Sequence, residues 1–72
     1  MTDEDITNKA IAANLEALER LLYNAHVCAS EAVVAMKLGE RNGAIGAALY
    51  IEDMLKQAAA LHGAAVALHR GR

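Results

Sequence analysis

Two long segments of the chain repeat apolar residues with a helical period, and a short polar stretch separates them. That stretch is Leu38-Gly39-Glu40-Arg41-Asn42-Gly43, whose glycines and polar residues suit the end of one helix and the start of another. The pattern predicts an all-α fold, an antiparallel two-helix hairpin in one domain of residues 1–72. We expect helix one at about 3–38, the turn at about 39–42 and helix two at about 43–69.

Helix one is expected to begin with a polar cap. The Thr2 hydroxyl can accept a hydrogen bond from the backbone N–H of residue 4 or 5, and Asp3, Glu4 and Asp5 suit the positive end of the helix dipole. From Ile11 onward, apolar residues fill positions a, d and e of a seven-residue repeat in which Ile11 is a. This stripe consists of Ile11, Asn14, Leu15, Leu18, Leu21, Leu22, Ala25, Cys28, Ala29, Ala32, Ala35 and Met36.

Helix two carries a stripe of the same period when Ile51 is placed at position a. We expect both stripes to be buried between the helices, a polar cap near Asn42, and a close approach of the two backbones that compensates for Gly43 and Gly46. The second stripe consists of Ala44, Ala47, Ala48, Ile51, Met54, Leu55, Ala58, Leu61, His62, Ala65, Leu68 and His69.

Large apolar residues near the turn lie off both stripes, where the hairpin alone cannot cover them. A chain of 72 residues with one Cys has no internal disulfide and no zinc pattern to support a small core. We therefore expect a second copy to cover this surface, giving a C2 homodimer and a coiled-coil-like four-helix bundle, although another protein could also cover it. The expected interface residues are Val27, Val33, Val34, Leu38, Ile45 and Leu49.

Composition and charge narrow the choice of partner. Apolar residues make up 56% of the chain without Phe, Trp or Pro, which is typical of helical proteins. The net charge of −2 comes from 7 basic and 9 acidic residues mixed along the chain, so no field attracts nucleic acid or a membrane. The acidic start and the lack of an apolar run of about 20 residues predict a cytoplasmic protein with no membrane partner and a reduced Cys28.

Histidines provide the candidates for metal or small-ligand binding. His62 and His69 share one face of helix two, and Glu19 should lie level with His62. Seven residues span two helical turns, which is too far for one ion, and no Glu-x-x-His pair is present. His26 and Met54 are nearly level, an arrangement that haem proteins use, but no haem attachment motif accompanies them. We expect no metal and no cofactor.

The first stripe contains one cysteine, Cys28, and one polar residue, Asn14. Cys28, at a d position, is expected to pack in the seam. Asn14 either fixes the register, as buried Asn residues do in coiled coils, or lies at the frayed open end. The chain has no phosphate-binding loop, nucleophile elbow or paired catalytic carboxylate, so we expect no enzymatic activity.

The expected dimer resembles the Rop family, plasmid-encoded dimers of two-helix hairpins that bind RNA loop complexes, but only in architecture. The basic residues are too dispersed for that role to be carried over: Lys9, Arg20, Lys37, Lys56 and Arg70. The run Asn14-Leu15-Glu16-Ala17-Leu18 and the turn Gly39-Glu40-Arg41-Asn42 also resemble a group of short uncharacterised bacterial two-helix proteins, which implies no activity. The expected function is a non-enzymatic homodimer acting through protein–protein contacts, with a Rop-like nucleic-acid-binding regulator or a metal or ligand binder as alternatives.

Overall fold

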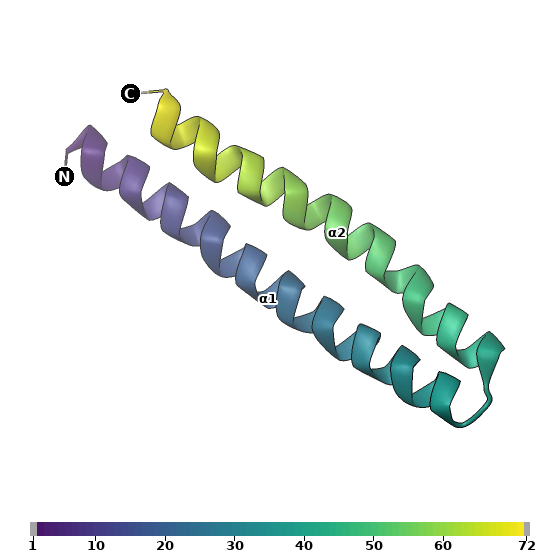
Figure 1. The fold of residues 1–72 in the computed structure, drawn as a ribbon. Helices are drawn as coiled ribbons and strands as arrows, with labels where there is room; N and C mark the ends of the chain where they lie inside the picture. Colours follow the sequence, from purple (N-terminus) through teal and green to yellow (C-terminus); the bar gives the residue numbers. More distant parts are fainter. Residues whose placement is uncertain (1, 72) are drawn as a thin grey trace.

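The computed structural model describes residues 2–71, which form two long helices packed side by side and antiparallel (Figure 1). Helix α1 spans Asp3–Lys37 and helix α2 spans Arg41–Arg70, and the described residues contain no strand. The hairpin measures 56 × 15 × 11 Å, so it is a single layer two helices wide. The all-α hairpin predicted from the sequence is confirmed. Neither helix combines the length and apolarity needed to cross a membrane.

Helix α1 begins with a capping box. The backbone N–H of Asp5 donates to Thr2 Oγ1 at 3.1 Å, and the backbone N–H of Thr2 donates to Asp5 Oδ2 at 3.3 Å. These reciprocal bonds satisfy two backbone donors that the first turn of a helix leaves free. The predicted cap is confirmed, and Asp5 acts both as its partner and as a negative charge at the positive end of the helix dipole.

A Schellman motif ends α1 and reverses the chain. Gly39 adopts φ 79°, a left-handed conformation that strains any residue with a Cβ. Its N–H donates to the carbonyl of Met36 at 3.0 Å, and the N–H of Glu40 donates to the carbonyl of Ala35 at 2.8 Å. This 6→1 and 5→2 pair of bonds defines the motif. The polar stretch of the sequence therefore turns the chain because of Gly39.

Helix α2 begins earlier than the sequence indicated. Its first residue is Arg41 and its N-cap is Glu40, which makes no side-chain capping bond. The prediction of a cap near Asn42 was wrong, because Asn42 already lies inside the helix. The reason is that the backbone of Glu40 serves both helices: its N–H closes the Schellman motif and its carbonyl accepts from the N–H of Ala44 at 3.0 Å.

The seam between the helices is narrower than the predicted stripes. Its fully buried residues are all alanines, namely Ala25, Ala44, Ala58 and Ala65, and the larger a and d residues beside them are half-buried. Leucines and methionines at the e positions were expected in the seam but are 47–52% exposed: Leu15, Leu22, Met36 and Leu55. A single partner helix covers positions a and d and leaves e at the edge of the contact. That part of the prediction was wrong.

Close backbone approach explains neither helical glycine near the turn. A Cβ at Gly46 would meet no atom within 4 Å, and one at Gly43 would make ordinary contacts of 3.8–4.0 Å with Glu40 and Ala35. The close backbone approach that was expected to offset the cost of a helical glycine is therefore absent at Gly46. Gly39 is different: a glycine is favoured there because φ is positive, although a Cβ would find free space.

We expect Gly46→Ala to stabilise the hairpin by about 1 kcal/mol, because alanine loses less backbone entropy in a helix and finds free space there. Gly39→Ala should destabilise it by about 1 kcal/mol, because alanine is strained at positive φ. Urea unfolding at one fixed protein concentration measures both. Gly63→Ala is the matched control, since its Cβ also meets nothing within 4 Å and it should behave like Gly46→Ala. Stabilisation by Gly39→Ala would contradict the turn geometry.

We expect Thr2→Ala to fray the first turn of α1, because the amide of Asp5 loses its acceptor. A cap of about 1 kcal/mol corresponds to an exchange rate about fivefold faster for the amide of Asp5. Hydrogen exchange followed by NMR measures this rate. Thr2→Ser keeps the hydroxyl and should leave the rate unchanged, whereas equal rates in all three proteins would show that the cap contributes nothing.

Candidate interaction surface

Most large apolar side chains of the described residues lie on the outside of the hairpin. The fully buried positions hold only alanine, and no large side chain is completely enclosed. So much exposed apolar surface, spread over both helices, is unusual for a protein that functions as an isolated chain. The exposed large apolar residues are Ile6, Leu15, Leu22, Tyr23, Val27, Val33, Val34, Met36, Leu38, Ile45, Leu49, Tyr50 and Leu55.

Near the turn, a shallow groove crosses the seam from one helix to the other, and we call it the bridging groove. Val33 and Met36 contribute from α1, and Ile45 and Ala48 contribute from α2. The side chains of Val33, Met36 and Ile45 are 51–55% exposed although they lie next to the seam. The remaining lining residues are Ala32, Lys37 and Ala44. The bridging groove is therefore an almost continuous apolar surface built by both helices.

A second groove, which we call the outer groove, is built from α1 and the turn without any residue of α2. Its apolar lining includes Val27, Val34 and Leu38, which are 37%, 56% and 69% exposed. The other lining residues are Tyr23, His26, Ser30, Glu31, Ala35 and Glu40. Two carboxylates and an imidazole therefore lie among the apolar residues of the outer groove. The bridging groove instead has Lys37 as its charged lining residue.

The structure divides the six residues predicted at the subunit interface among separate surfaces. Val33 and Ile45 line the bridging groove. Val27, Val34 and Leu38 line the outer groove, and Leu49 lines neither of them. All six are exposed in the single chain, as the prediction requires, but they do not line one groove. A partner that packs flat against one side of the hairpin would leave some of them uncovered.

Sequence reasoning missed part of the exposed apolar surface. Leu15, Leu22, Met36 and Leu55 were assigned to the seam because they continue the a, d and e stripe. Their exposure shows that the e positions face away from the single partner helix. A signal was available: a pair of helices fills two positions in seven, so a three-position stripe indicates contact with more than one neighbour.

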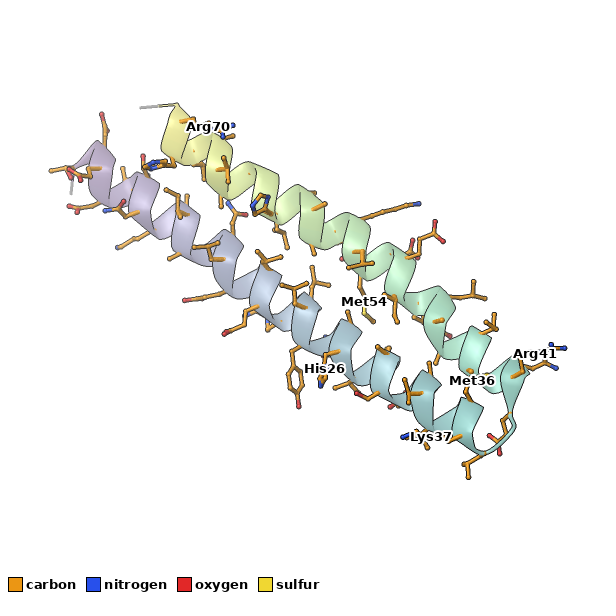
Figure 2. The ribbon with its side chains drawn as sticks, viewed as in Figure 1. His26, Met36, Lys37, Arg41, Met54 and Arg70 are labelled. Atoms are coloured by element: carbon orange, nitrogen blue, oxygen red, sulfur yellow. The ribbon has the colours of Figure 1, made fainter. Side chains whose placement is uncertain are left out.

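The candidate chemical residues do not converge. His62 and His69 are exposed, and residues 2–71 contain no group of three or more His, Cys, Asp or Glu that could hold a metal ion. Met54 points into the space between the helices, while His26 points away from α2, so the two do not face each other (Figure 2). Cys28 is half-buried in the seam as a free thiol.

The basic residues labelled in Figure 2 are divided between the two ends of the hairpin. Lys37 and Arg41 lie near the turn and Arg70 lies at the opposite end (Figure 2). The ion pair found among residues 2–71 joins Lys56 Nζ to Glu52 Oε1 at 3.2 Å, and both side chains are well exposed. Such an exposed helical pair contributes about 0.3–0.5 kcal/mol. The apolar surface is consequently the candidate functional feature of the hairpin.

Comparison of this chain with protein-family models, with curated proteins and with solved structures found no match. The function of the hairpin must therefore be argued from its own surface.

Proposed function

We propose that this chain is a non-enzymatic cytoplasmic protein that pairs with a second copy of itself into a four-helix bundle and acts through protein–protein contacts. The observation that carries the proposal is the excess of exposed surface on the single hairpin. The exposed apolar residues on both helices give that excess its chemical character.

The excess can be estimated from the size of the chain. The hairpin exposes 5407 Å², whereas a compact monomer of its mass, 7.6 kDa, exposes about 4,300 Å². The difference of about 1,100 Å² is larger than the roughly 800 Å² that each partner buries in a stable protein–protein interface. An equivalent copy that buried this standard area would therefore remove most of the excess.

The poor interior of the single hairpin supports the same conclusion. Only alanines are fully buried, and alanine contributes little apolar area. Burying a large aliphatic side chain contributes about 1.5–3 kcal/mol, so side chains that are half exposed still have roughly half of that to gain. Four such residues on each subunit would add several kcal/mol, which is comparable with the whole stability of a small domain.

Pairing alone does not define a biological role. The dimer would act through the surfaces that pairing leaves exposed. A bundle of two hairpins keeps the outer faces of its helices accessible. Contacts with other proteins would be made there, through exposed residues such as Tyr23 and Leu49, which are 66% exposed in the hairpin. No observation favours a catalytic, nucleic-acid-binding or metal-binding role over this one.

We expect sedimentation equilibrium at micromolar concentration to give about twice the 7.6 kDa chain mass. The melting temperature should rise with protein concentration, because association stabilises the folded state by mass action. Raising the salt from 0.1 to 1 M should not dissociate the dimer, since its contacts are apolar. A species of 7.6 kDa that melts cooperatively at the same temperature at every concentration would overturn the proposal.

A further inference from the structure

The hairpin has two sides that could receive the second copy, one on each side of the seam. In the seven-residue repeat, the e positions flank the buried a and d positions on one side and the g positions flank them on the other. The observed seam follows this repeat along both helices: positions a and d from Ile11 to Ala35, and again from Ala44 to Leu68, are buried or half-buried. The two sides can therefore be compared residue by residue.

The e side of α1 is apolar over its length. Its members are Leu15, Leu22, Ala29 and Met36, and all four are exposed in the hairpin. They recur every seven residues and lie beside the seam without entering it. This is the pattern expected of a helix that contacts a second neighbour in a bundle.

The e side of α2 continues this surface across the seam. Ala48 lies in the bridging groove together with Met36 of α1, and Leu55 follows seven residues later at 52% exposure. Further along α2 the e positions change to His62 and His69, both exposed. The shared apolar surface therefore covers the turn end and the middle of the hairpin.

On the g side, polar residues interrupt the apolar surface in the middle of the hairpin. Asn24 and Glu31 occupy g positions in the middle of α1, and Gln57 occupies one in α2. All three are exposed, and Glu31 forms no ion pair among residues 2–71. Covering this side would bury a carboxylate and two amides without partners, which is costly.

We infer that the second copy packs on the e side, so that Leu22, Met36 and Leu55 become the central layers of the four-helix bundle. The inference rests on the proposed dimer and specifies which surface forms it. A second copy fits because it brings the same seven-residue spacing, so side chains of one subunit can enter the spaces of the other. The area to be covered matches one equivalent hairpin. The outer groove then remains outside the subunit interface.

Paired charge substitutions distinguish the e side from the outer surface of the hairpin. Leu22→Glu with Leu55→Glu places carboxylates on the e side. Val34→Glu with Leu49→Glu is the matched control, because these residues are at least as exposed in the hairpin, at 56% and 66% against 47% and 52%. Glutamate is a good helix former, so neither pair should unwind a helix. Sedimentation equilibrium of the wild type and both variants gives the association constants.

The e-side pair should weaken association by at least about 100-fold, because four carboxylates would become buried without partners. The control pair should change it by less than about threefold, as surface substitutions usually do. If the wild type is a dimer and the control pair dissociates it, or both pairs dissociate it equally, the choice of the e side is wrong. A monomeric wild type would instead overturn the proposed function itself.

A labelling experiment tests the same choice without introducing charge. In a Cys28→Ala background, Ala29→Cys places a thiol on the e side and Ser30→Cys places one on the adjacent outer position; both residues are exposed in the hairpin. As protein concentration rises through the association range, labelling at position 29 should slow by about tenfold or more relative to position 30, since a packed interface excludes the reagent. Equal rates at the two positions, or slower labelling at position 30, would overturn the inference.

Discussion

A pair of helices can cover only a narrow strip of each other, and this geometric limit determines the rest of the structure. Each helix presents two of every seven residues to its neighbour. In this chain many of these positions hold alanine, including Ala25, Ala44, Ala58 and Ala65, the fully buried residues. Small side chains let the helices lie close together but leave little interior. The larger apolar residues consequently lie at the edges of the contact or outside it.

Local interactions explain why the hairpin was largely predictable from its sequence. The capping box uses Thr2 and Asp5, three residues apart, and the turn depends on the backbone freedom of Gly39. The seven-residue repeat then sets which face of each helix meets the other. All three signals are contained in short stretches of the chain, so they could be recognised without knowing its partners. The one local error, the cap near Asn42, arose because the backbone of Glu40 closes one helix and opens the next.

The candidate surface was less predictable, because the width of a buried stripe depends on how many neighbours a helix has. Leu22 and Leu55 look like seam residues if three positions in seven are assumed to face one partner. The structure shows that positions a and d alone fill the contact between the two helices, so Leu22 and Leu55 are instead candidates for contact with a partner. Sequence reasoning also grouped Val33 with Val34, although adjacent helical residues point about 100° apart and these two line different grooves. Three-dimensional placement was needed to separate the surfaces.

The two properties of the hairpin, its weak interior and its apolar edges, follow from one distribution of side chains. If the leucines at positions e stood at a or d instead, the seam would hold larger residues and the edges would hold fewer. The chain instead places alanine at seven of the sixteen a and d positions of the seam, and leucine or methionine at several e positions beside them. That arrangement leaves the isolated hairpin with few large buried side chains, and in the proposed pair of hairpins it would supply a central layer of large side chains. Folding and association would then be a single process, because the residues that would complete the core of each subunit lie at its contact with the other.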